Sequence, residues 1–156
     1  MVSIVTGKIN SGKTSFMLKH YLTNLKGDGF LSLKTMEGSQ VKRYDAFQLS
    51  TNKDALLVIK EEDFDKEVIQ CQIGPYLFLE EGMKWIESSI IKMIENKVEP
   101  IYLDEIGLLE LDDLGFSNIL KKMVESNLEL VISIRTDLVE QIIHKYNLKD
   151  VLIICE

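Results

Sequence analysis

The stretch Gly7-Lys8-Ile9-Asn10-Ser11-Gly12-Lys13-Thr14 follows the apolar run Val2–Val5 and precedes a segment with helical spacing of apolar residues. Its pattern, G-x-x-x-x-G-K-[ST], is that of a phosphate-binding P-loop when it connects a strand to a helix. Glycines let the backbone wrap around phosphate oxygens, and the N–H groups at the start of the helix face the anion. The stretch therefore predicts a β-loop-α unit that binds a phosphorylated ligand.

The residues of this loop have separate expected roles. In P-loop enzymes the lysine reaches the β- and γ-phosphates, and the hydroxyl that follows it holds Mg²⁺. We therefore predict Lys13 as a catalytic residue and Thr14 as a magnesium ligand. The residues expected to contact the nucleotide are Gly7, Lys8, Ile9, Asn10, Ser11, Gly12, Lys13, Thr14 and Ser15.

A P-loop also needs a carboxylate on the metal side, at the end of another strand. The apolar run 101–103 ends in Asp104 and Glu105. We predict that Asp104 completes the magnesium site. If the strand continues, Glu105 points to its opposite side, and we predict that it is the general base for a water aimed at the γ-phosphate. The alternative for both is a solvated carboxylate at a strand end.

Further candidates follow other predicted strands. Arg135 comes directly after the run 130–134, which contains Ser133, so both lie near the edge where parallel sheets bind ligands. Arg135 is a candidate catalytic residue that stabilises transition-state charge, and Ser133 is a candidate sensor of the γ-phosphate. The alternatives are a surface arginine and a buried, hydrogen-bonded serine. Lys42 and Arg43 either fold over the nucleotide or belong to an exposed, charged strand edge.

The order of the elements predicts the fold class. Strands and helices alternate at both ends of the chain, which is typical of a parallel sheet with crossover helices. Between them, short β-type runs and turn residues predict an antiparallel insertion over about residues 29–80. We expect one domain, residues 1–156, with a three-layer α/β fold and a mainly parallel sheet. The predicted strands are 2–6, 30–33, 41–49, 55–59, 76–79, 101–103, 128–134 and 151–154; the predicted helices are 13–26, 85–94, 114–124 and 136–146.

Composition excludes several classes of protein. The chain has 156 residues, of which 46% are hydrophobic and 28% charged, and this is ordinary for a globular domain. A net charge of -7 argues against broad electrostatic binding of nucleic acid or anionic membrane. No run approaches the roughly 20 apolar residues that span a bilayer, and the first residues lack a signal-peptide pattern. We therefore expect a cytoplasmic protein with a nucleoside triphosphate as its partner; the sequence identifies no protein partner.

Two other kinds of P-loop protein fit less well. Asp104 and Gly107 match the D-x-x-G of a GTPase switch, but the guanine-reading N-K-x-D is absent, because Thr51–Asp54 has its aspartate one position too early. Nucleoside and nucleotide kinases usually clamp phosphates with several arginines, and this chain has two, Arg43 and Arg135. Phosphoryl transfer and a nucleotide-dependent binding module remain alternatives to hydrolysis.

Three segments together resemble the THEP1 family of small P-loop nucleoside-triphosphatases over nearly the whole chain. They are the P-loop, the β-type run opening at Gly29-Phe30, and Asp104-Glu105-Ile106-Gly107 followed by Glu110-Leu111. The P-loop is shared with many families, whereas D-E-I-G followed by x-x-E-L is more particular to this one. The resemblance implies a RecA-like α/β fold and Mg²⁺-dependent hydrolysis of ATP, GTP and other triphosphates, with Asp104 and Glu105 as the acid pair.

The chain departs from the family pattern at three positions. It has Leu108 where the family usually has lysine, Met36 where it has an arginine in the first hairpin, and Ser15 where it has a second threonine. If either missing cation contacts phosphate in relatives, that role is lost here or passes to another cation. The candidates for that cation are Lys34, Lys42 and Arg43.

Overall fold

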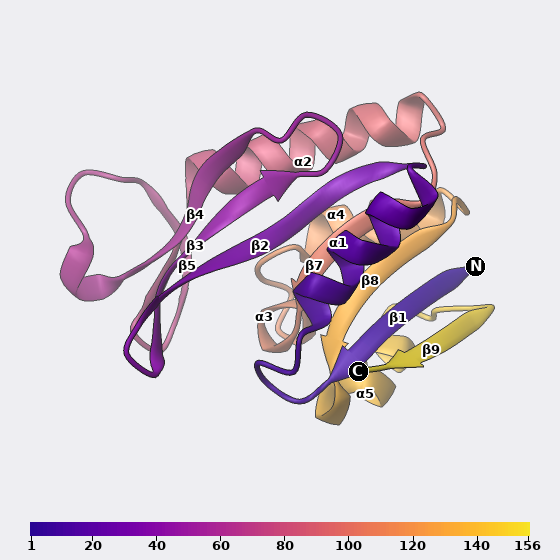
Figure 1. The fold of residues 1–156 in the computed structure, drawn as a ribbon. Coiled ribbons are helices and arrows are strands. Elements are labelled where there is room, and N and C mark those ends of the chain that lie inside the picture. Colours follow the sequence, from indigo (N-terminus) through magenta and orange to yellow (C-terminus); the bar gives the residue numbers. More distant parts are fainter.

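A single sheet of nine strands runs through the molecule, in the order β5-β6-β4-β3-β2-β7-β8-β1-β9 (Figure 1). The computed structural model describes all of residues 1–156. The strands are β1 (Val2–Gly7), β2 (Asp28–Glu37), β3 (Gln40–Gln48), β4 (Asp54–Lys60), β5 (Ile69–Ile73), β6 (Tyr76–Leu79), β7 (Ile101–Ile106), β8 (Leu130–Arg135) and β9 (Val151–Cys155). The α-helices are α1 (Lys13–Asn24), α2 (Glu80–Glu95), α3 (Leu108–Leu111), α4 (Ser117–Glu125) and α5 (Val139–Lys145), and the 3₁₀ helices are η1 (Glu61–Asp63) and η2 (Thr136–Leu138).

The part of the sheet from β2 to β9 is parallel, as predicted, but the pairings from β2 to β5 are all antiparallel, so the sheet is mixed rather than mainly parallel. β8 lies between β1 and β7 and pairs with both in parallel, and β9 extends the parallel part on the other side of β1. The P-loop strand and the strand that carries Asp104 are therefore separated by one strand. Because the carboxyl ends of parallel strands meet at one edge, β1, β7 and β8 deliver their following residues to the same place.

The antiparallel insertion is confirmed for β3 to β6, but its start differs from the prediction. β2 pairs in parallel with β7 over Asp28–Phe30 and then in antiparallel fashion with β3. The insertion therefore grows out of a strand that also belongs to the parallel sheet. This continuity matters for the site, because it fixes the direction in which β2 passes the P-loop.

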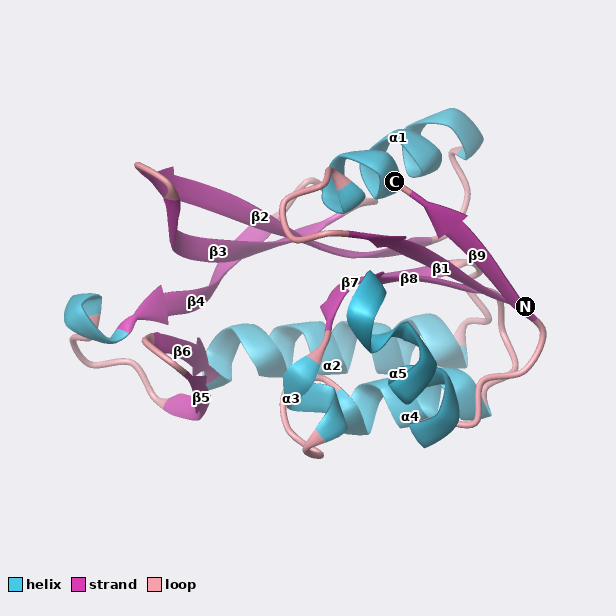
Figure 2. Cartoon of the chain, turned by 90° about the horizontal axis from the view of Figure 1, so that it is seen from below, coloured by secondary structure: helices cyan, strands magenta, loops and turns pink.

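Helices cover both faces of the sheet. Figure 2 shows α1 on one face and α2, α4 and α5 on the other. The side chains of β7 alternate between these two faces. Tyr102 packs with Met17 of α1 on one face. Ile101 and Leu103 point to the other face, where they belong to the large core that also contains Ile90 of α2. No helix is both long and apolar enough to cross a membrane.

The predicted helices form, with shifted boundaries. α1 ends at Asn24 because Leu25 adopts a left-handed backbone, with φ of 47°. The expected helix 114–124 begins only at Ser117, since Asp113 and Gly115 have φ of 60° and 61°, which interrupts a helix. The short helix α3 precedes this break, and the sequence did not predict it.

Candidate phosphate-binding site

The loop between β1 and α1 has the backbone that its glycines predict. Gly12 precedes α1 with φ of 101°, a left-handed conformation that glycine adopts without strain. A Cβ atom at Gly7 would collide with Ser11 Oγ, so the loop backbone packs against its own side chain there. Ser11 Oγ is also the one buried side-chain polar atom without a hydrogen-bond partner in the chain. A buried, unpaired hydroxyl inside such a loop is suited to an anionic ligand.

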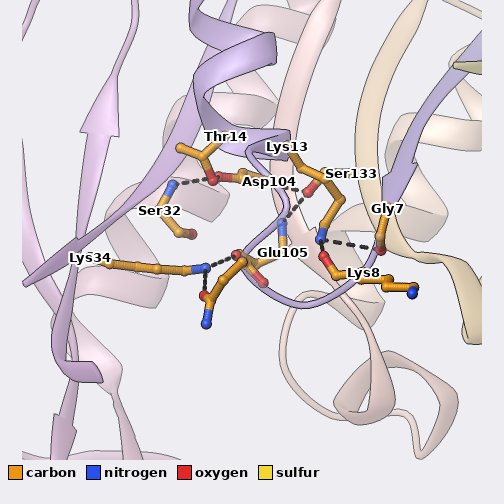
Figure 3. Close-up of polar contacts among 10 residues, drawn as sticks. Gly7, Lys8, Lys13, Thr14, Ser32, Lys34, Asp104, Glu105 and Ser133 are labelled. Carbon is orange, nitrogen blue, oxygen red and sulfur yellow. Dashed lines mark hydrogen bonds and ion pairs between the residues drawn. The ribbon is translucent and has the colours of Figure 1, made fainter. Parts of the chain in front are cut away.

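Lys13 lies buried against the same loop (Figure 3). Its Nζ donates to the carbonyl oxygens of Lys8 at 2.9 Å and Gly7 at 3.4 Å. An ammonium group has three donors, so one remains for a phosphate oxygen. Burial lowers the pKa of Lys13, and the nearby carboxylate of Glu105 opposes this shift.

Asp104 and Thr14 meet although they are far apart in the sequence. Thr14 Oγ1 donates to Asp104 Oδ2 at 2.6 Å, and the backbone N–H of Ser32 donates to the same oxygen at 3.1 Å. The other carboxylate oxygen accepts from the hydroxyl of Ser133. Asp104 is only 1% exposed, so these bonds fix its carboxylate. The structure thus brings together the two residues predicted to hold a magnesium ion.

Glu105 follows in an irregular part of β7 rather than in regular strand alternation. Its φ is 66°, and the pairing of β7 with β8 shifts register between Leu103 and Ile106. Such a backbone in a non-glycine residue costs on the order of 1–3 kcal/mol and is most frequent at functional sites. Its side chain lies 3.5 Å from Lys34 Nζ. Burial and the charge of Asp104 raise the pKa of Glu105, while Lys34 and Lys13 lower it.

Ser133 links the two acids. In addition to its bond to Asp104, its hydroxyl accepts the backbone N–H of Glu105 at 2.8 Å. The residue is fully buried. The structure therefore favours the buried, hydrogen-bonded serine over the sensor of the γ-phosphate.

Arg135 lies beside the loop, since it is opposite Gly7 in the pairing of β1 with β8. Its guanidinium donates to both carboxylate oxygens of Asp137, with Nη2 at 2.8 Å from Oδ2. This pairing raises the pKa of Arg135. Arg135 nevertheless lines the same cavity as Lys13 and Glu105.

Of the three cations considered as substitutes for the missing family residues, Lys34 reaches the site. Its Nζ donates to Asn10 Oδ1 of the P-loop at 2.9 Å and faces Glu105. Arg43 instead pairs with Asp45 at 3.1 Å, and neither Arg43 nor Lys42 lines the cavity. Lys42 and Arg43 are exposed and lie away from the cavity. The predicted strand edge is wrong, however, because β3 lies between β2 and β4 and pairs with both.

Glu110 is a site residue that reasoning from chemistry missed, although it belongs to the family-like segment. Its carboxylate is 3% exposed and accepts the backbone N–H groups of Gly107 and Phe116, each at 2.8 Å. Burial raises its pKa to about 7. Glu110 thereby anchors the loop that directly follows the acid pair.

Fold and site together define a class: an α/β protein whose P-loop meets a buried aspartate through a threonine hydroxyl is a P-loop nucleotide-binding protein. The model of the NTPase family matches residues 3–155. The chain belongs to this family, with the THEP1-like proteins, and is a nucleoside-triphosphatase. A sequence comparison with curated proteins gives no match.

Two solved structures share the fold. The solution structure of a human cancer-related nucleoside triphosphatase is 18% identical, with a TM-score of 0.67, and the match covers 98% of this chain and 87% of that one. The crystal structure of THEP1 from the hyperthermophile Aquifex aeolicus is 17% identical, also with a TM-score of 0.67, and the match covers 99% of this chain and 88% of that one.

Proposed function

We propose that this chain hydrolyses nucleoside 5'-triphosphates, including ATP and GTP, in a Mg²⁺-dependent reaction at the P-loop. The observation that carries the proposal is the contact between the loop and the acid pair: Thr14 bonds to Asp104, and Glu105 follows directly in the chain. Backbone contacts to phosphate do not read the base, so we expect several triphosphates to be substrates.

The residues at this contact fit a magnesium ion. The Thr14 hydroxyl and the Asp104 carboxylate supply oxygen ligands, which Mg²⁺ prefers. No group of three or more His, Cys, Asp or Glu side chains forms a metal site in the chain. This agrees with Mg²⁺, which is usually bound by one or two protein ligands, substrate phosphates and water. When bound, the ion would neutralise charge on the β- and γ-phosphates.

The P-loop residues hold the triphosphate in this proposal. The N–H groups at the start of α1 and the unpaired hydroxyl of Ser11 face the phosphates, and Lys13 provides its free donor to the β- and γ-phosphates. Arg135 stabilises the charge that develops on the γ-phosphate after leaving Asp137.

Glu105 acts as the base. A water oxygen bonds to the γ-phosphorus, the bond from this phosphorus to the β,γ-bridging oxygen breaks, and the proton of the water passes to the Glu105 carboxylate. The raised pKa of Glu105 favours this role, because a base with a higher pKa accepts a proton more readily. Lys34 orients the carboxylate by holding it from the side of β2.

Phosphate release from ATP, GTP, CTP and UTP tests this proposal. Glu105→Gln keeps the size of the side chain and removes the base, so we expect turnover to fall by about 100-fold or more while affinity for a non-hydrolysable triphosphate stays similar. Lys13→Ala is expected to lower both turnover and affinity for the triphosphate, and removal of Mg²⁺ by EDTA is expected to stop the release of phosphate. Glu125→Gln, the same change at an exposed site on α4, serves as the control. Equal turnover in Glu105→Gln and the parent would remove Glu105 from this role.

A further inference from the structure

The cavity beside the P-loop is much larger than hydrolysis requires. Its volume is about 460 Å³, whereas one water occupies about 30 Å³. Its lining extends from Lys13 and Glu105 to Tyr76 and Phe78 in the β insertion and to Phe116 before α4. Cavities of roughly 300–1,000 Å³ with mainly apolar walls are typical of sites for whole organic molecules. The extra space therefore requires an explanation beyond an attacking water.

The cavity lies on the γ-phosphate side of the P-loop. Lys13 and Glu105 line it, but Gly12, Thr14 and Ser15 at the start of α1 do not. A P-loop places the α- and β-phosphates on the loop backbone and the γ-phosphate at the lysine. The nucleoside attached to the α-phosphate therefore extends away from Glu105, so a bound triphosphate leaves the apolar part of the cavity free.

A continuous series of contacts joins the proposed base to the aromatic wall. Lys34 Nζ lies 3.5 Å from the Glu105 carboxylate and 6.0 Å from the centre of the Tyr44 ring. The Tyr44 ring in turn meets the ring of Tyr76 edge-on, with 6.4 Å between their centres. Burial and the nearby Glu105 raise the pKa of Tyr44, so its hydroxyl stays protonated and able to donate. A molecule on this wall thus has its near end beside the base (Figure 3 shows the Lys34–Glu105 contact).

The charges around the cavity restrict what binds there. Its cations, Lys13, Lys34 and Arg135, all lie at the phosphate end, and the part formed by residues 40–79, from β3 to β6, contains no lysine or arginine. A second phosphate group placed on this wall would have no cation to pair with, which is unfavourable in an apolar site. Aromatic and aliphatic side chains instead suit an uncharged, planar ring.

We propose that this cavity binds an uncharged nucleoside and that the enzyme transfers the γ-phosphoryl group to one of its hydroxyl groups. The hydroxyl oxygen bonds to the γ-phosphorus, the bond to the β,γ-bridging oxygen breaks, and the hydroxyl proton passes to Glu105. The products are a nucleoside monophosphate and a nucleoside diphosphate. The proposal rests on the proposed function, because it uses the same P-loop and the same base with the nucleoside in place of water.

Transfer of label from [γ-³²P]ATP tests this proposal, with adenosine, guanosine, cytidine, uridine or thymidine as the acceptor. We expect labelled monophosphate from at least one of them. Ile73→Trp fills the end of the cavity formed by β5, so we expect transfer to fall about tenfold or more while phosphate release without nucleoside stays within about twofold. The matched control is Ile69→Trp, the same substitution in the same strand, at a residue that is 40% exposed and outside the cavity. Leu108→Trp narrows the cavity from α3 and replaces Ile73→Trp if that variant does not fold.

Each other outcome has one meaning. Phosphate release from ATP without labelled monophosphate from any of the five nucleosides overturns the acceptor proposal and leaves hydrolysis standing. If the enzyme neither releases phosphate nor transfers label, the proposed function is overturned as well. If Ile73→Trp raises the KM for ATP about tenfold in the absence of nucleoside, the cavity holds the triphosphate's own base, and the acceptor proposal is wrong.

Discussion

Glu110 is expected to make the stability of this enzyme depend on pH, and the structure gives the sign. In the folded chain burial raises the pKa of Glu110 to about 7, from an ordinary value of 4.5. Between these two values the folded protein holds a proton that the unfolded chain has lost. Protonation of Glu110 therefore stabilises the folded state relative to high pH, and this stabilisation is fully present below about pH 4.5 and is lost as pH rises through about 7. At about 1.4 kcal/mol per pH unit, the free energy of unfolding falls by about 2.5 kcal/mol between pH 5 and pH 8.5.

Glu110→Gln isolates this contribution. The glutamine does not titrate, and its NH₂ group cannot accept one of the two backbone N–H groups that the carboxylate now accepts. Leaving one buried N–H unpaired costs about 1–3 kcal/mol. We therefore expect the variant to be less stable than the parent at pH 5, and the difference to shrink by about 2.5 kcal/mol by pH 8.5.

Urea denaturation at several pH values, followed by the fluorescence of Trp85, measures this difference. Trp85 is the only tryptophan, and it packs against Phe30 in the core, so its signal reports global unfolding. The exposed Glu125→Gln is the control, and its curve is expected to run parallel to that of the parent. A difference between Glu110→Gln and the parent that stays constant from pH 5 to pH 8.5 would refute the reasoning, because it would show that Glu110 does not titrate in this range.

Three further changes probe the contacts around the acid pair. Lys34→Met removes a charge that lowers the pKa of Glu105, so the acidic limb of the kcat–pH profile is expected to move to higher pH. The exposed Lys42→Met is the control. A limb that does not move, or that moves equally in the control, contradicts this expectation. Ser133→Ala leaves the backbone N–H of Glu105 without its acceptor, so the free energy of unfolding, measured by urea denaturation, is expected to fall by about 1–3 kcal/mol. Steady-state kinetics are expected to show a larger loss in kcat than in triphosphate affinity. Values like those of the parent would argue against the linking role of Ser133. Arg135→Ala is expected to lower kcat with little change in KM. Asp137→Ala frees the guanidinium of Arg135 and is expected to retain kcat. An equal loss of kcat in both variants would mean that the ion pair matters only for structure.

The parallel part of the fold could be predicted because each of its elements has a local signal. The spacing from Gly7 to Thr14 identifies the strand, loop and helix, and apolar runs mark β7, β8 and β9. β5 and α3 have no such signal. β5 is a short strand with glutamines at positions 70 and 72, and α3 covers only four residues, Leu108–Leu111, before Asp113 breaks the helix. Elements of this length depend on packing against the rest of the chain, which a single sequence does not show.

The site residues likewise divide into those that the sequence could predict and those that it could not. Thr14 and Asp104 were predictable because the ends of parallel strands meet at one edge. The linking role of Ser133 was not, since it depends on β8 lying between β1 and β7 and on the irregular backbone at Glu105. Lys34 was one of three candidate cations, and only the path of β2 past the P-loop distinguishes it from Lys42 and Arg43.

The position of Lys34 gives the site a cation, although Met36 stands where the resemblance to the THEP1 family leads us to expect an arginine. Lys34 and Met36 are two residues apart in β2, and the pairing of β2 with β3 shifts register between Thr35 and Met36. Met36 is 47% exposed, near the end of that strand, whereas Lys34 lies closer to the P-loop and contacts both Asn10 and Glu105. A charge at position 34 therefore lies next to the proposed base. In this chain the hairpin cation therefore acts on Glu105 itself, which is why Lys34→Met is expected to change the pH profile.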